Sequence, residues 1–67
     1  MNDLRRRRLD AGLTQAQLAE ESGIYWRTID RVERGESKPN DATVIALAKA
    51  LGCAPSDLAL ELEREAA

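Results

Sequence analysis

Four glycines divide the 67-residue chain into short segments, and their spacing is the feature that most restricts its fold. Glycine readily takes the left-handed backbone conformation that ends a helix. The segments around Gly12, Gly23, Gly35 and Gly52 are rich in Leu, Ala, Arg and Glu, which together favour helix over strand. The sequence shows neither strand-like alternation nor an internal repeat. It therefore predicts an all-α fold, a compact five-helix domain that occupies residues 1–67.

Capping signals place the predicted helices along the chain. Thr14 and Gln17 have the Ser/Thr-x-x-Glu/Gln spacing of a capping box. Asn40 can cap a fourth helix, and Pro55 suits the first turn of a fifth. The predicted helices span residues 2–11, 15–22, 25–34, 41–51 and 55 to about 67.

Composition limits the chemistry that the chain can perform. Cys53 is the single cysteine and there is no histidine, so a disulfide, a Cys/His zinc site and the usual general base are missing. No Gly-rich phosphate loop is present either. We therefore expect a non-enzymatic protein with no metal and no cofactor. Cys53 is expected to be a buried, inert thiol in a reduced intracellular setting.

Apolar runs are too short for a membrane protein. The longest, residues 44–48, is far below the roughly 20 residues of a membrane-spanning helix. No apolar segment follows the charged residues 5–8, so a signal peptide is not expected.

Charge is nearly balanced, with a formal net charge of −2 at pH 7. Taken alone, this argues against a general binder of polyanions. Residues 1–38 contain eight Lys/Arg and seven Asp/Glu, whereas residues 39–67 contain two and five. A nucleic-acid-binding face is therefore expected in the first half of the chain.

Residues 15–34 carry the strongest functional signal. Two short helices are joined there through Gly23, which permits a tight turn, and the small Ala19 lets the helices cross closely. Ile29 and Val32, three residues apart, would anchor the second helix from behind and turn its other face outward. A helix held in this way, with its N-terminal side chains projecting, fits a DNA major groove.

Several short stretches also match one family pattern at the right spacing. They are residues 12–19 (Gly-Leu-Thr-Gln-Ala-Gln-Leu-Ala), 23–24, 28–29 and 31–35 (Arg-Val-Glu-Arg-Gly), followed by Pro39, Thr43, residues 47–52 and residues 57–58. With these stretches the chain resembles the Cro/repressor (XRE, lambda-repressor-like) helix-turn-helix family over roughly residues 4–60. The resemblance implies that the second helix lies over the DNA backbone and the third enters the major groove.

The resemblance also implies roles for individual residues. The base-reading positions would be Trp26, Arg27 and Arg31. Arg31 is the strongest candidate, because a guanidinium can form paired hydrogen bonds with guanine, whereas Trp26 suits a thymine methyl or a sugar. Residues that would contact the DNA backbone are Gln15, Tyr25, Thr28, Arg34 and Lys38, with Gln15 alternatively locking a neighbouring side chain.

Two positions depart from the family pattern. Tyr25 stands where a Ser or Thr usually caps the third helix, and the loss of such a cap costs about 1 kcal/mol. This predicts a displaced or frayed start of that helix. Asp30 faces outward on the same helix and would repel phosphates unless it pairs with Arg27, Arg34 or a cytosine amino group.

The first helix is expected to place Leu4, Arg8 and Leu9 on one side. The family pattern pairs an arginine at Arg8 with a glutamate at Glu33, which implies a structural ion pair inside the domain. If the pair is largely buried, removal of one partner should cost about 3–5 kcal/mol. The neighbouring arginines at residues 5–7 are expected to form a solvated helix face, with a basic patch as the alternative.

Leu58, Leu60 and Leu62 are more leucines than one face of the last helix would bury. Either some of them are exposed, or residues 55–67 contribute to a homodimer. Tyr25 and Trp26 could also form a protein-interaction patch, since exposed aromatic side chains are typical of interface hot spots.

These observations predict a sequence-specific double-stranded DNA-binding protein, a small repressor-like transcriptional regulator in the cytoplasm, associated with the nucleoid. We expect a homodimer, at least on DNA, that binds a palindromic operator with half-sites about 34 Å apart. The alternative is a protein-interaction module, antitoxin-like or a co-regulator, that uses Tyr25 and Trp26 as its contact.

Overall fold

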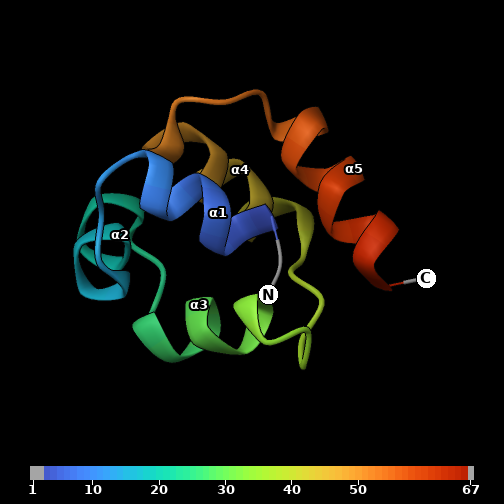
Figure 1. The fold of residues 1–67 in the computed structure, drawn as a ribbon, viewed down its shortest axis with the longest axis horizontal. Coiled ribbons are helices and arrows are strands. Elements are labelled where there is room, and N and C mark those ends of the chain that lie inside the picture. Colours follow the sequence, from blue (N-terminus) through green and yellow to red (C-terminus); the bar gives the residue numbers. More distant parts are fainter. Residues whose placement is uncertain (1–2, 67) are drawn as a thin grey trace.

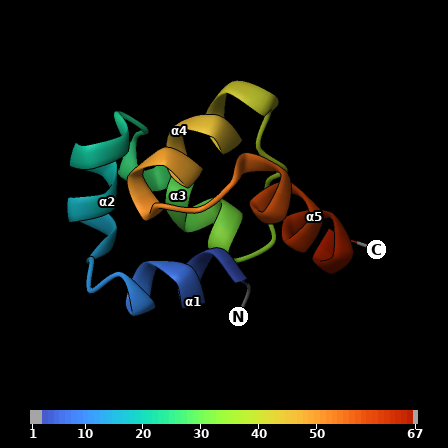
Figure 2. The ribbon, with the colours of Figure 1, turned by 90° about the horizontal axis from the view of Figure 1, so that it is seen from above.

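The computed structural model describes residues 3–66, which form five helices. They are α1 (Asp3–Asp10), α2 (Gln15–Ser22), α3 (Trp26–Glu33), α4 (Asp41–Leu51) and α5 (Pro55–Ala66). Helices α2 and α5 lie at opposite ends of the molecule, with α1 and α4 between them (Figures 1 and 2). The domain measures 29 × 22 × 21 Å along its principal axes. The predicted all-α, five-helix fold is confirmed.

Local hydrogen bonds fix both ends of α2. The Gln17 backbone N–H donates to Thr14 Oγ1 over 3.0 Å, and the Thr14 N–H donates to Gln17 Oε1 over 2.8 Å. This is the predicted capping box. At the other end, Gly23 has φ 76° and its N–H donates to the Ala19 carbonyl oxygen over 2.9 Å. Because this left-handed conformation strains residues with a Cβ, glycine makes the turn toward α3 possible.

Similar capping residues mark both ends of α4. The Thr43 N–H donates to Asn40 Oδ1 over 2.8 Å, and Gly52 ends the helix in a left-handed conformation. The helices lie within one residue of their predicted bounds wherever the structure describes the chain. Residue 2, where the first helix was expected to begin, and residue 67 lie outside the described residues.

Every helix contributes to one hydrophobic core. Helix α2 packs against α3 and α4, and α5 packs against α1 and α4. The core side chains are at most 7% exposed and are Leu4, Leu18, Ile29, Val32, Val44, Leu47, Ala48 and Leu58. Full burial of one leucine or isoleucine contributes about 1.5–3 kcal/mol, so this shared core holds the short helices together.

Two predictions about leucines are wrong. Leu9 was expected on the same side of the first helix as Leu4 and Arg8, but it is 54% exposed whereas they are buried, because α1 turns only a narrow side toward the core. Leu58 is fully buried between α5 and the rest of the domain, so it is not available for contact with a second copy. Leu62 is partly buried against the same core, and Leu60 is 62% exposed.

No single helix within residues 3–66 is long and apolar enough to cross a membrane. Helices α4 and α5 meet the requirements of length and composition only as a pair, and they are bent by 116° at the break between them.

Candidate nucleic-acid interface

Helix α3 presents two different faces. Ile29, Val32 and Glu33 are buried and hold the helix against the domain. Arg27 and Arg31 are exposed on the other side. A short helix with its back fixed in this way cannot rotate freely, so its outward side chains keep a defined direction.

The first turn of α3 forms without a side-chain cap. Tyr25 occupies the cap position and its side chain makes no capping hydrogen bond. Its carbonyl oxygen accepts from the N–H groups of Thr28 (3.0 Å) and Ile29 (3.2 Å), so the helix is regular from Trp26 onward. The missing cap was predicted correctly, but the predicted displacement of the helix start is not observed. Ile29, in the same turn, is fully buried and anchors this end of α3 in the core.

Two aromatic side chains project at this end of α3. Tyr25 is 62% exposed and Trp26 is 44% exposed, with ring centroids 6.0 Å apart. The Arg27 guanidinium carbon lies 5.5 Å from the Trp26 ring centroid, within the range of a cation–π contact. The arginine is therefore held next to a flat apolar surface and remains open to solvent.

The three predicted base-reading residues lie together. Trp26, Arg27 and Arg31 line one shallow groove of about 220 Å³ on the outer side of α3. The groove is also lined by Asp30, Arg34 and Glu36. Carboxylates thus stand among the arginines, and the surface has a mixed charge.

Arg8 and Glu33 form an ion pair beneath α3. Arg8 Nε donates to Glu33 Oε2 over 2.7 Å and Nη2 donates to Oε1 over 3.1 Å. A third donor, Nη1, reaches the Leu13 carbonyl oxygen over 2.9 Å. The two side chains are 9% and 5% exposed. This pair ties the end of α1, the loop after it and the end of α3 into one unit.

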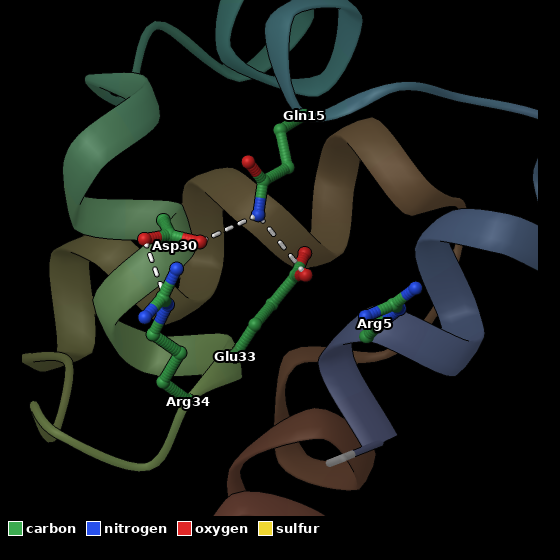
Figure 3. Close-up of a pocket in the computed structure, with 5 residues that line it drawn as sticks. All are labelled: Arg5, Gln15, Asp30, Glu33 and Arg34. Atoms are coloured by element: carbon green, nitrogen blue, oxygen red, sulfur yellow. Dashed lines mark hydrogen bonds and ion pairs between the residues drawn. The ribbon is translucent and has the colours of Figure 1, made fainter.

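Gln15, the first residue of α2, connects this pair to the surface. Its Nε2 donates to Glu33 Oε1 over 3.3 Å and to Asp30 Oδ1 over 3.1 Å (Figure 3). Asp30 Oδ2 also accepts from Arg34 Nε over 3.1 Å. The hydrogen bond from Gln15, and then the bond and charge of Arg34, hold the pKa of the Asp30 carboxyl below its usual value.

The same residues border an open pocket of about 330 Å³, with Arg5 on its far side (Figure 3). Sequence reasoning named Arg34 among the partners that could neutralise Asp30, which the four-residue spacing on a helix suggests. It allowed Gln15 to lock a neighbouring side chain but did not identify Asp30 as the partner, because that contact depends on how α2 crosses α3.

The other predicted backbone contacts are less closely grouped. Thr28 is half-buried on α3, and Lys38 is exposed in the loop that follows it. Among the side-chain hydrogen bonds and ion pairs of the described residues, none joins Thr28 or Lys38 to Gln15, Asp30 or Arg34.

Neighbouring arginines of α1 have different environments, because one faces solvent and the next contacts α5. Arg7 forms a paired hydrogen bond with Glu61, with Nε–Oε1 and Nη2–Oε2 distances of 2.7 and 2.6 Å. This bond raises the pKa of Arg7 and lowers the pKa of Glu61. Arg6 is 60% exposed and lies 3.2 Å from Asp3. The prediction of a solvated face holds for Arg6, whereas Arg7 fastens α5 to α1.

Among the side chains that the structure describes, those of residues 3–64, no group of three or more His, Cys, Asp or Glu is arranged to hold a metal ion. Cys53 is half-buried against the core rather than fully buried as expected.

A short helix, a tight glycine turn and a second helix with a buried back and an arginine-bearing front define a helix-turn-helix domain. Residues 4–58 match the model of the helix-turn-helix family, and the chain belongs to that family. The match agrees with the Cro/repressor type predicted from the sequence. Members of this family are DNA-binding regulators and are generally not enzymes. Comparison with curated proteins and with solved structures gave no match.

Proposed function

We propose that this protein is a sequence-specific regulator of transcription, repressor-like, that reads double-stranded DNA with α3. The observation that carries the proposal is the construction of α3. Its back is fixed by Ile29, Val32 and the buried Glu33, while Arg27 and Arg31 project into solvent. A helix about 12 Å across with its side chains fills a B-DNA major groove, which is about 12 Å wide.

The projecting side chains suit different base edges. Arg31 can donate two parallel hydrogen bonds to guanine O6 and N7, the commonest specific contact in the major groove. Arg27 is placed beside Trp26 and can reach a neighbouring base or phosphate from that position. The Trp26 face offers apolar contact to a thymine methyl group.

Residues around α3 are proposed to hold the DNA backbone. Gln15 lies at the N-terminus of α2, where the positive end of the helix dipole favours a phosphate. Tyr25, Thr28, Arg34 and Lys38 are the further proposed contacts. Because few of these residues are cationic and the chain has a net charge of −2, a single copy should bind weakly.

Two copies on a palindromic site would supply the missing affinity. We propose a homodimer, at least on DNA, with half-sites about 34 Å apart. Leu60 on α5 is the exposed leucine that such a dimer could cover, with the partly buried Leu62 at its margin.

The first experiment enriches randomised duplex DNA on the purified protein at near-physiological salt and sequences the retained molecules. Recovery of an inverted repeat is the expected result, and its spacing reports the geometry of the dimer. If no motif is recovered and binding simply fades as salt rises, the contact is only electrostatic and the proposed sequence reading is wrong.

Arg31→Ala then tests the base-reading role. On the enriched site the substitution should weaken binding by about 1–3 kcal/mol and relax the preference at one base pair. Lys49→Ala, which removes one exposed charge near the end of α4, is the control for the change in net charge. Equal weakening on every sequence would assign Arg31 to the backbone instead.

Exposure of the two aromatic side chains supports one alternative. Tyr25 and Trp26 are 62% and 44% exposed and lie next to each other, as at a protein interface. In this alternative the domain is an antitoxin-like or co-regulator module that binds a protein partner. Tight binding of a protein that is lost in Trp26→Ala, together with DNA binding that ignores sequence, would favour it.

A further inference from the structure

Asp30 holds two of the side chains that are proposed to contact phosphate. Its Oδ1 accepts from Gln15 Nε2 and its Oδ2 accepts from Arg34 Nε, both over 3.1 Å (Figure 3). The donors come from the start of α2 and the end of α3. Together they converge on a single carboxylate that lies at an open pocket.

A carboxylate and a phosphate present similar acceptors to these donors. Both offer two oxygens that share negative charge, and arginine binds either of them. A phosphate that approached Gln15 or Arg34 would therefore compete with Asp30 for the same N–H groups. It would also meet the negative charge of Asp30, since an aspartate is ionised at neutral pH.

The positions of the three side chains allow such an exchange. Arg34 is 65% exposed and Asp30 is 27% exposed, so solvent and ligands reach their contact. The second contact of Gln15, with the buried Glu33 Oε1 at 3.3 Å, can use the other N–H of the amide, so the N–H that leaves Asp30 is open to another acceptor. An exposed pair of this kind contributes little to stability, so DNA contacts can overcome it.

We propose that Asp30 acts as an internal competitor of DNA phosphates, occupying Gln15 and Arg34 in the free protein and lowering the sequence-independent part of DNA affinity. The proposal rests on the DNA-binding function proposed above. Removal of the Asp30 carboxylate should therefore strengthen DNA binding, whereas removal of a base-reading residue should weaken it.

The test compares Asp30→Asn with the wild type on a mixed-sequence duplex and on the enriched duplex, over a range of salt concentrations. Affinity should rise roughly two- to fivefold on both duplexes, from the range of an exposed ion pair. The slope of log affinity against log salt should steepen, by at most about 0.9, since the charge of Asp30 no longer offsets that of Arg34 at one phosphate. Circular dichroism checks that the helices are retained, and Asp30→Ala is a second variant if Asp30→Asn fails to fold.

Two controls separate this effect from a change in net charge. Glu63→Gln removes an exposed carboxylate on α5, and its smaller effect gives the contribution of overall charge. In the Arg34→Ala background, Asp30→Asn should give little further gain. A gain equal to that of Glu63→Gln, a gain that is undiminished without Arg34, or a loss confined to the enriched duplex would overturn the proposal.

A second readout needs no DNA. Inorganic phosphate is titrated into isotope-labelled protein, and the side-chain N–H resonances of Gln15 and Arg34 are followed by NMR. They should shift at lower phosphate concentration in Asp30→Asn than in the wild type, and identical titrations would overturn the competition. If the wild type fails to bind any duplex, the proposed function fails, and this titration still decides the role of Asp30.

Discussion

Removal of the charge on Glu33 should strongly destabilise the domain. Glu33→Gln keeps the shape of the side chain and one oxygen acceptor, but it leaves the Arg8 guanidinium without a counter-charge. The Arg8 side chain is 9% exposed, and its guanidinium would retain the bond to the Leu13 carbonyl oxygen. Breaking a buried pair by removing one partner costs about 3–5 kcal/mol, and we expect about 3 kcal/mol because an acceptor remains.

The size of this effect is large for a chain of 67 residues. At about 0.05–0.15 kcal/mol per residue, the whole domain has a stability of about 3–10 kcal/mol. The substitution would remove between a third and nearly all of it. In a domain of this size each 1 kcal/mol lowers the melting temperature by roughly 4–8 °C, so a fall of roughly 12–24 °C is expected.

Urea denaturation followed by far-ultraviolet circular dichroism measures the change in the free energy of unfolding. The double variant Arg8→Met, Glu33→Leu is the informative control, because apolar replacement of a whole buried pair is often close to neutral. It should be more stable than Glu33→Gln, although the Leu13 carbonyl oxygen loses a donor. A cost below about 1 kcal/mol for Glu33→Gln, or a double variant less stable than the single one, would refute the reasoning.

Three further predictions follow from the structure. Tyr25→Ser should stabilise the domain by about 0.5–1 kcal/mol in urea denaturation, because serine can cap the free N–H groups of α3. Gly23→Ala should destabilise it by about 1 kcal/mol, since the φ of 76° strains an L-residue although no atom lies within 4 Å of the added Cβ. Glu61 has a lowered pKa in the folded state, so its contribution to stability is present above the unfolded value of about 4.3 and is lost as the pH falls through the folded value. Glu61→Gln should therefore be less stable than the wild type at neutral pH, and the difference should vanish in acid when both are denatured with urea.

Each of these three predictions has a result that contradicts it. An unchanged or lower stability of Tyr25→Ser would mean that α3 does not gain from a cap. A neutral Gly23→Ala would show that the turn adjusts its backbone. A difference between Glu61→Gln and the wild type that is constant from neutral to acidic pH would mean that ionisation of Glu61 does not stabilise the contact with Arg7.

The ends of the helices could be predicted from sequence because their causes are local. Thr14 and Gln17 bond to each other across three residues, and Asn40 bonds to Thr43 in the same way. Gly23 needs only its own backbone conformation to end α2. The presence of five helices, the helix-turn-helix arrangement and the family were therefore accessible without coordinates.

Side chains that depend on distant partners were predicted less well. Leu58 was considered for a dimer contact, but it fills the core. Periodicity shows which residues share a face of a helix, but it does not show which face the rest of the domain covers. Arg7 was expected in solvent and instead pairs with Glu61, 54 residues away along the chain. The Arg8–Glu33 contact was expected only because the family pattern implied it.

The sequence by itself determined where the chain forms helices, where it turns and which residues of α3 can face outward. Only the tertiary structure decided how those outward residues are held. The crossing of α2 over α3 brings Gln15 to Asp30, 15 residues away, and links it to the buried Glu33. Hydrogen bonds of this kind depend on the angle and separation of two helices, which the packing of the whole core sets. A one-dimensional pattern specifies the residues on each helix, but not this geometry.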